Sequence, residues 1–281
     1  MIRIIADTTC CLPVKQMEKL GIDFLPQIIT FTGKSYRDDY EISTDEFLEK
    51  LRSSAQLPGT AAPPPALYIP IFQKILDEGD TALVLAPTAK MSGTYRSAMV
   101  AADEFNSDRI HIVDTKLLAG NLGTVVLQAH KWAQEGLGID EIIERVGELA
   151  SRNQTYFLVP TMEYLHKGGR IGGAAKLIGT LLQIVPILTL RDGTIEVYDK
   201  VRSIKQAVSN LVALNTSICE GNPEAHLTVG SCDSQQLLDK ITSSLRENLS
   251  VDDLPSYTAP PAIVVHAGPG LVVTSCFSKP D

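Results

Sequence analysis

The sequence has few cysteines, and no pattern organises them. Five cysteines occur in 281 residues, an odd number, and none forms the C-x-x-C pair that is typical of zinc sites. We therefore expect no disulfide framework and no metal. The adjacent Cys10 and Cys11 leave redox or metal chemistry open, but buried free cysteine also behaves as a small apolar residue, and we prefer that interpretation.

Catalytic signatures are missing as well. No G-x-S-x-G elbow of a serine hydrolase occurs. The glycine-rich run at residues 168–173 has neither the Gly-Lys-Ser/Thr ending of a Walker loop nor the strand–glycine–helix order of a dinucleotide site. We expect no cofactor, and we favour a binding protein over an enzyme.

Positive charge is scarce, and long apolar runs are absent. The net charge of -8 argues against a nucleic-acid partner, because phosphate backbones favour basic surfaces. There is no signal-peptide pattern and no apolar run of about 18 residues, so we expect a soluble, cytoplasmic protein without a transmembrane segment. Transient contact with a membrane stays open. A composition of 44% hydrophobic and 21% charged residues is typical of a globular protein.

The order of the predicted elements indicates the fold class. Strands and helices alternate through residue 150, which predicts a parallel sheet with helices on both faces. A hairpin at Asp192-Gly193 and further strand–helix units then predict a mixed sheet covered by helices. We predict an α/β fold of two α/β domains, residues 1–154 and 155–281, with a ligand cleft between them.

Periodicity and turn residues predict the separate elements. Strands are expected at 2–6, 81–86, 109–113, 157–159, 226–231 and 262–266. Helices are expected at 44–52, 94–105, 119–135, 139–152, 174–184, 203–214 and 234–249. Residues 57–65 are expected to form a loop, because their prolines and glycine disfavour both a helix and a central strand.

Two polar positions lie at the ends of predicted strands. Ser92 and Gly93 open a predicted helix, and a hydroxyl beside free helix N–H groups suits a carboxylate or phosphate. An ordinary serine cap explains the same pattern. Asp7 ends the first strand, where it could contact a ligand, but an N-cap role is preferred.

Basic residues and a histidine occur in the second half. Arg170 follows two glycines, Arg202 closes a predicted strand, and His266 ends the last predicted strand. Arginine binds phosphate or carboxylate through two parallel hydrogen bonds, so a convergence of these residues would favour an anion. Each arginine could equally be a solvated surface group, and a lone histidine is more often structural than catalytic.

Several segments resemble the DegV family of bacterial fatty-acid-binding proteins. The segments that carry this resemblance span the chain, namely IIADTT at 4–9, SGTYRSA at 92–98, VDTK at 113–116, LHKGGRI at 165–171, LLQIVPIL at 181–188, DG at 192–193, VR at 201–202 and HAGPG at 266–270. No single motif is specific, but their order covers essentially the whole chain.

The resemblance implies a function. Similar proteins hold one long-chain fatty acid in a buried tunnel and present its carboxylate to a separate ATP-dependent fatty acid kinase, which forms the acyl phosphate. By position, Thr60, Ser92, Gly93 and His266 would bind the carboxylate. Arg170 and Arg202, with His266, would face the phosphoryl group or the kinase.

One segment departs from the family pattern. The family has a Thr-Ser-Gln-Pro-Ser loop here; Thr60 matches, but Ala61, Ala62 and Pro64 replace Ser, Gln and Ser. The change removes side-chain donors, so the ligand could differ. Two alternatives therefore stay open: a small-molecule phosphotransferase or acyl-phosphate hydrolase, and a carrier of another lipid or acidic metabolite.

Overall fold

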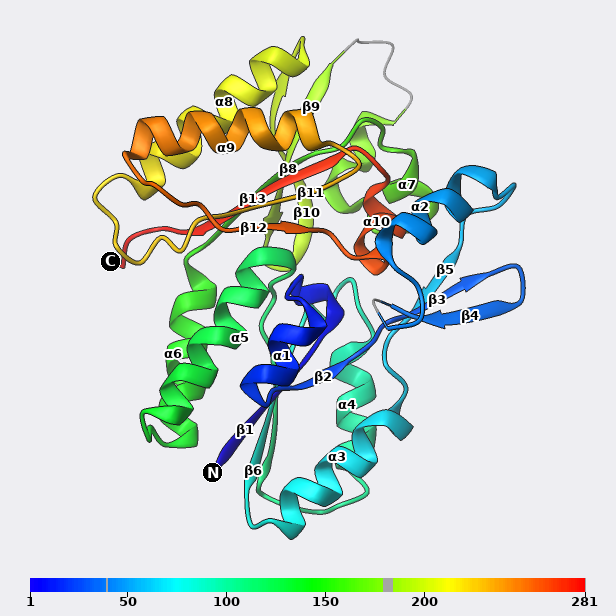
Figure 1. Ribbon diagram of the computed structural model, residues 1–281, viewed down its shortest axis with the longest axis vertical. Helices are drawn as coiled ribbons and strands as arrows, with labels where there is room; N and C mark the ends of the chain where they lie inside the picture. The colour runs from blue at the N-terminus through cyan, green and yellow to red at the C-terminus, as the bar shows by residue number, and fades with distance from the viewer. Residues whose placement is uncertain (39, 179–183, 281) are drawn as a thin grey trace. The chain divides into compact units, whose positions relative to one another are not determined.

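The computed structural model describes residues 1–38, 40–178 and 184–280. Its chain divides into two compact units, coloured along the chain in Figure 1. The first unit comprises Met1–Ser151 together with Pro260–Ala262, and the second comprises Arg152–Ala259 together with Ile263–Asp281. Each unit is built around a sheet of its own.

The main sheet of the first unit is entirely parallel. Its strands, in spatial order, are β2 (Asp23–Leu25), β1 (Ile2–Asp7), β6 (Thr81–Ala86) and β7 (Ile110–Asp114). The predicted parallel sheet is thus confirmed. Because all four strands run the same way, the segments that follow β1 and β6 emerge at one edge of the sheet, where ligand-binding loops of open α/β sheets lie.

Helices cover both faces of this sheet. On one face, α3 (Pro65–Asp77) and α4 (Thr94–Ala102) pack their apolar side chains against Ile5, Ala82 and Val84. The alternate residues of the strands, such as Leu83, are also fully buried and face the other side, where α5 (Ala119–Gln134) packs beside α6 (Ile139–Ser151) (Figure 1). Gly123 lets α5 approach closely, since a Cβ there would lie 2.5 Å from the Cys10 carbonyl oxygen. The 3-10 turn η1 (Thr8–Cys10) and the helix α1 (Val14–Leu20) follow β1 along the chain.

A second, antiparallel sheet corrects the prediction of a loop at 57–65. It consists of β4 (Lys34–Arg37), β3 (Ile28–Phe31) and β5 (Gly59–Ala61), in that spatial order. A proline-rich segment can supply β5 because it is an edge strand, which needs backbone partners on one side only. Pro65 begins α3, a position where its missing N–H costs nothing. The helix α2 (Thr44–Ser53) follows β4 and begins with a capping box between Ser43 and Glu46.

The predicted mixed sheet of the second unit is confirmed, and within the described residues it has six strands. In spatial order they are β10 (Thr194–Val201), β9 (Val185–Arg191), β8 (Asn153–Leu158), β13 (Leu271–Phe277), β11 (Thr228–Cys232) and β12 (Ser256–Thr258). Among the described strand pairs of this sheet, β11 and β12 pair in parallel and the others are antiparallel. The predicted hairpin turn is confirmed: Asp192 and Gly193 both have positive φ, as a two-residue type I′ turn requires.

Helices α8 (Ile204–Cys219) and α9 (Gln235–Leu249) lie side by side over this sheet (Figure 1). Their buried faces contribute Leu211, Ile241 and Leu245 to a core that includes Ile187 of β9 and Val229 of β11. The shorter elements of the unit are α7 (Glu163–Lys167), the 3-10 helix η2 (Gly172–Leu177) and α10 (Pro261–Ala267).

Two predictions in the second half need correction or restriction. Residues 262–266 form α10 rather than a strand. An apolar run this short fits either structure, and Pro261 as its first residue is a helix-start signal that decides for the helix. The helix predicted at 174–184 is a 3-10 helix up to Leu177, and residues 179–183 lie outside the described part of the chain.

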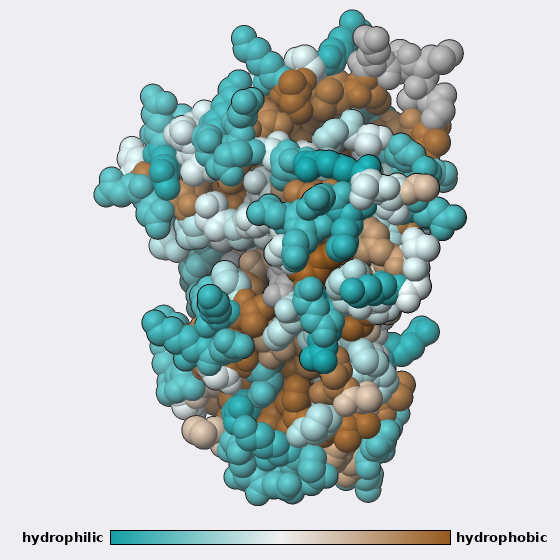
Figure 2. Space-filling view, turned by 45° about the vertical axis from the view of Figure 1, so that its right-hand side comes forward, coloured by the Kyte–Doolittle hydropathy of each residue, from teal (hydrophilic) through white to brown (hydrophobic). Residues whose placement is uncertain are grey.

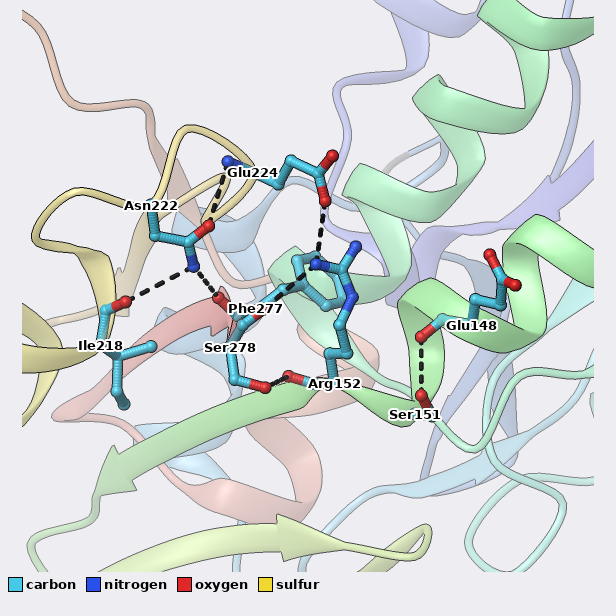
Figure 3. A network of polar contacts seen from close by, with 8 residues as sticks. All are labelled: Glu148, Ser151, Arg152, Ile218, Asn222, Glu224, Phe277 and Ser278. Carbon is cyan, nitrogen blue, oxygen red and sulfur yellow. Dashed lines mark hydrogen bonds and ion pairs between the residues drawn. The ribbon is translucent and has the colours of Figure 1, made fainter. Parts of the chain in front are cut away.

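Arg152 ties the beginning of the second unit to the end of the chain (Figure 3). Its guanidinium donates to Glu224 at 2.9 Å and to the Ser278 carbonyl oxygen at 3.2 Å, and its own carbonyl accepts from the Ser278 N–H at 2.9 Å. Asn222 donates to the Phe277 carbonyl oxygen at 2.9 Å. These bonds hold the segments next to the start of β8 and the end of β13 together.

Hydrophilic residues cover much of the visible face, with apolar patches between them (Figure 2). Exposed large apolar side chains belong to several different elements, for example Val100 of α4, Tyr198 of β10 and Ile204 of α8. In the described residues, no helix has the length and apolar character needed to span a membrane.

Candidate functional site

A fully buried carboxylate stands at the end of β1. The Asp7 side chain is inaccessible to solvent, and Thr9 donates to Oδ1 through its backbone N–H at 2.9 Å and through its hydroxyl. Gln27 Nε2 and Thr94 Oγ1 both donate to Oδ2 at 2.6 Å. The N-cap role preferred for Asp7 is confirmed by its bond to the Thr9 N–H at the start of η1, but the carboxylate also connects β1 to α4.

Burial raises the pKa of Asp7 above its ordinary value, although the hydrogen bonds from Thr9, Thr94 and Gln27 act in the opposite direction. The same environment affects Tyr68 of α3. Burial, together with the charge of Asp7, raises the pKa of Tyr68 well above its ordinary value. The first unit therefore holds a carboxyl group whose protonated form is unusually favoured.

Ser92 is linked to this carboxylate through Thr94. The two hydroxyl oxygens are 3.0 Å apart, and Ser92 Oγ also accepts from the Thr94 N–H at 3.3 Å. Gly93, rather than Ser92, occupies the N-cap position of α4. The Ser92 side chain is half-buried. Because its hydroxyl accepts from the Thr94 N–H, it lies beside the N-terminus of α4, where the free N–H groups and the helix dipole both favour a negative charge.

The segment around Thr60 lies next to the beginning of α4. A Cβ added at Gly93 would be 3.4 Å from the Cβ of Ala62, and the Ser97 hydroxyl donates to the Pro63 carbonyl oxygen. Thr60 itself is half-buried in β5, where it is paired with Ile29. Thus the structure brings together the two predicted carboxylate-binding segments of the first unit, around Thr60 and around Ser92, although they lie about 30 positions apart in the sequence.

A second group of predicted residues lies within the second unit. His266, in the last turn of α10, and Arg170, which follows α7, are close enough for the arginine charge to act on the imidazole. Burial, and to a smaller degree the charge of Arg170, lower the pKa of His266 to about 4. The histidine is therefore neutral at neutral pH, and the positive charge of this group is carried by Arg170.

Glycines make this approach possible. A Cβ at Gly168 would lie 2.4 Å from His266 Nδ1, and one at Gly268 would lie 2.5 Å from the Tyr164 ring. Arg170 Nη1 donates to the Gly168 carbonyl oxygen at 2.6 Å. The two glycine turns thus pack the His266 ring and the Tyr164 ring against neighbouring backbone, with no room for larger residues.

Arg202 lies elsewhere on the second unit. It follows β10, its side chain is exposed, and its backbone N–H donates to Gln206 Oε1 at 3.4 Å. The glycine run after Arg170 packs at the opposite end of β10, where a Cβ at Gly172 would meet the Ile195 carbonyl oxygen. Along a strand, Ile195 and Arg202 are separated by roughly 20 Å. A role for Arg202 beside Arg170 and His266 stays a prediction.

Sequence reasoning missed several residues of these groups. Gln27 comes from the segment between β2 and β3 and carries no local motif, so only the fold places it on Asp7. Thr94 was visible as part of the 92–98 match, but nothing in its sequence context indicated the bond to Asp7. Tyr164 precedes the glycine pair of the 165–171 match, and its contact with Gly268 is a tertiary one.

The described residues show no group of three or more His, Cys, Asp or Glu side chains that could hold a metal ion. All five cysteines are buried, which agrees with the interpretation of Cys10 and Cys11 as small apolar residues. Both groups of candidate residues are thus organised by hydrogen bonds and one arginine charge.

Comparison with known proteins finds relatives that match nearly the whole chain. A family model described as "Uncharacterised protein, DegV family" matches residues 1–279. The chain belongs to the DegV family. A DegV domain-containing protein of Caldanaerobacter subterraneus subsp. tengcongensis is 32% identical over 270 residues, which cover 95% of each chain.

Solved structures of DegV proteins have the same fold. A DegV family protein from Thermus thermophilus, described by its fatty acid binding, superposes with a TM-score of 0.92 at 30% identity and covers 99% of both chains. A fatty acid binding DegV family protein from Streptococcus agalactiae superposes with a TM-score of 0.90 at 26% identity, again over 99% of both chains. The resemblance inferred from the motifs is confirmed.

Proposed function

We propose that this DegV protein binds one long-chain fatty acid in a buried tunnel and presents its carboxylate to a separate ATP-dependent kinase in the cytoplasm, which forms the acyl phosphate. The observation that carries the binding part is the match, over 99% of the chain, to a DegV protein described by its fatty acid binding. We place the tunnel in a cleft between domains 1–154 and 155–281.

In this proposal, Ser92 and Thr60 donate hydrogen bonds to the carboxylate, and Gly93 leaves room for it at the start of α4. The closeness of the 60–63 segment to Gly93 supports this assignment. A hydroxyl that donates to a charged oxygen contributes roughly 1.5–3 kcal/mol, so two such donors would determine the orientation of the acid. His266 would add a neutral N–H donor.

The hydrocarbon tail supplies most of the affinity. Burying each methylene gains roughly 0.8 kcal/mol, so every two-carbon extension should strengthen binding roughly tenfold until the tunnel is filled. Long-chain acids are therefore preferred over short ones. The polar groups would select a carboxylate head, and the tunnel length would select the chain.

Phosphoryl transfer is assigned to the other group of residues. Arg170 is the charged partner for the incoming phosphoryl group or for an acidic surface of the kinase, and Arg202 would serve the same partner from the end of β10. The lowered pKa of His266 supports a role as a neutral hydrogen-bonding group, since at neutral pH it carries no extra proton to donate.

A carrier of another acid is the second candidate. It is favoured by Ala61, Ala62 and Pro64, which replace side-chain donors found in the family pattern. With fewer donors on this side, the head group could be larger than a carboxylate, or the acid could belong to a different class of lipid.

Native mass spectrometry of freshly purified protein, followed by denaturing extraction, tests the binding proposal. One fatty acid per chain is the expected result. An isoprenoid, a sterol or a short acid would replace the proposal by the second candidate.

The kinase part is tested separately with protein loaded with radiolabelled palmitic acid. ATP alone should give no acyl phosphate, whereas ATP with an extract of the source cells should give a product that hydroxylamine traps as the hydroxamate. Steady turnover by the purified chain with ATP alone, lost in His266→Ala, would instead indicate a phosphotransferase.

A further inference from the structure

The hydrogen of the Ser92 hydroxyl has two possible directions, toward Thr94 or away from it, because Ser92 ends a series of hydrogen bonds that begins at Asp7. Ser92 Oγ lies 3.0 Å from Thr94 Oγ1, which in turn lies 2.6 Å from Asp7 Oδ2. A hydroxyl has one hydrogen to donate, so the direction of each bond in this chain depends on the next.

When Asp7 is ionised, its oxygens only accept. Thr94 then donates its single hydrogen to Asp7 Oδ2 and accepts from Gln27 Nε2 at 2.9 Å, so its second lone pair can accept the hydrogen of Ser92. In that arrangement the hydrogen of Ser92 points into the protein. A ligand carboxylate would meet a lone pair of Ser92 and, behind it, a buried negative charge.

When Asp7 is protonated, the hydrogen bonds between Asp7, Thr94 and Ser92 are donated in the opposite direction. Asp7 donates to Thr94 Oγ1, Thr94 donates to Ser92 Oγ, and Ser92 also accepts from the Thr94 N–H, so both of its lone pairs are used. Its hydrogen must then point away from Thr94, where a carboxylate can accept it.

The surroundings of Asp7 allow its carboxyl group to be protonated, because no charged donor among the described residues holds it in the ionised form. The donors that reach Asp7, from Thr9, Gln27 and Thr94, are all uncharged. Tyr68 of α3 is the titratable side chain that faces Asp7, and it stays neutral because burial raises its pKa well above the ordinary value. Cys10, the next titratable residue in the chain, is a buried thiol on η1.

We propose that Asp7 and Thr94 are positioning residues for Ser92: a protonated Asp7 turns the Ser92 hydroxyl toward the ligand, and binding of the carboxylate takes up one proton from solvent at Asp7. This inference rests on the proposed role of Ser92 in carboxylate binding. It makes the affinity for the acid decrease as the pH rises through the range in which Asp7 ionises in the free protein.

Asp7→Asn provides the test, because an amide can donate to Thr94 but cannot ionise. Its second N–H can donate to Gln27 once the Gln27 amide turns over. Dissociation constants for palmitic acid and oleic acid are measured for both proteins from about pH 5.5 to about pH 8. For each acid, the dissociation constant of the wild type is divided by that of Asp7→Asn at the same pH, since the titration of the ligand itself then cancels.

The dissociation constant of the wild type, divided by that of Asp7→Asn, should rise with pH, with a limit of about tenfold per pH unit for one proton. A ratio that is constant with pH overturns the inference. If neither protein binds either acid, while circular dichroism shows both folded, the proposed function fails and this inference with it.

Two threonine variants separate positioning from simple stability. Thr94→Val removes the hydroxyl that links Asp7 to Ser92 and should weaken binding about tenfold at the lowest pH, whereas Thr94→Ser should restore it. Thr9→Val removes a hydrogen bond from the other oxygen of Asp7. It should keep the wild-type affinity at low pH and shift the pH dependence upward. Equal effects of Thr94→Val and Thr9→Val would mean that both act through stability alone.

Discussion

The neutral state of His266 leads to a quantitative prediction about stability and pH. Its pKa is about 4 in the folded protein, against about 6.5 for an unperturbed histidine. The unfolded chain therefore binds a proton at a higher pH than the folded chain does. Each unit of difference corresponds to about 1.4 kcal/mol, so the full effect is about 3 kcal/mol.

The sign follows from the lowered pKa. Above about pH 6.5 the histidine is neutral in both states and has no pH-dependent effect. As the pH falls from there toward 4, only the unfolded state takes up the proton, and the folded state loses about 1.4 kcal/mol per pH unit. Below about pH 4 both states are protonated, and the loss is complete.

The assay compares the wild type with His266→Asn. Free energies of unfolding from urea titrations are measured between about pH 4 and about pH 7.5, and the difference between the two proteins cancels the other titrating groups. The stability of the wild type relative to the variant should drop by about 3 kcal/mol toward acid. Proton NMR provides a direct check. The His266 signal is the wild-type histidine signal that is absent from the spectrum of His266→Asn, and in the wild type it should titrate near pH 4.

Parallel stability curves for the two proteins, or an NMR pKa near 6.5, would refute the reasoning. Arg170→Met separates the two causes. Since burial is the larger cause and the Arg170 charge the smaller one, the pKa of His266 in this variant should stay nearer to about 4 than to the ordinary value of about 6.5. A complete return to the ordinary value would mean that the arginine, and not burial, controls His266.

Three further substitutions test the assigned roles. Ser92→Ala should weaken fatty-acid binding by roughly 1–3 kcal/mol in a fluorescence titration, because the carboxylate loses a donor. Arg170→Ala should leave the dissociation constant of the acid nearly unchanged and reduce kinase-dependent acyl phosphate formation. Gly168→Ala should lower the free energy of unfolding by roughly 1–3 kcal/mol, because its Cβ would lie 2.4 Å from His266 Nδ1. As its matched control, Gly147→Ala in the exposed face of α6 should raise stability by roughly 0.5–1 kcal/mol.

Each of these substitutions has an outcome that would contradict it. Unchanged affinity in Ser92→Ala would remove Ser92 from the head-group site. If Arg170→Ala lost acid binding and phosphorylation equally, Arg170 would belong to that site too. Similar stabilities of the Gly168→Ala and Gly147→Ala proteins would show that His266 moves aside at no cost.

Much of the fold follows from local patterns. Apolar runs alternating with capped helical segments were sufficient to predict the parallel sheet, and the Asp192-Gly193 turn was sufficient to predict the β9–β10 hairpin. These features depend on the preferences of neighbouring residues, which the sequence displays directly. The motif order was likewise sufficient to identify the family.

Local patterns did not predict the structure of short apolar and proline-rich segments. The run at 262–266 has a composition that suits a strand, yet it forms α10, and the 57–65 segment contains β5. A strand of three residues is stabilised by the strand it pairs with, here β3, and not by its own sequence. The tertiary neighbour therefore decides the structure of β5, whereas the helix at 262–266 is indicated locally by Pro261.

The candidate sites show the same division. The sequence by itself determined which residues could bind an anion, since Ser92, Arg170 and His266 have the right chemistry at the ends of elements. Only the tertiary structure decided what surrounds them, because a buried Asp7 behind Thr94 and an arginine beside a neutral His266 arise from segments distant in sequence. Burial and charge act over a few ångströms in space, and the chain order does not record which groups come that close.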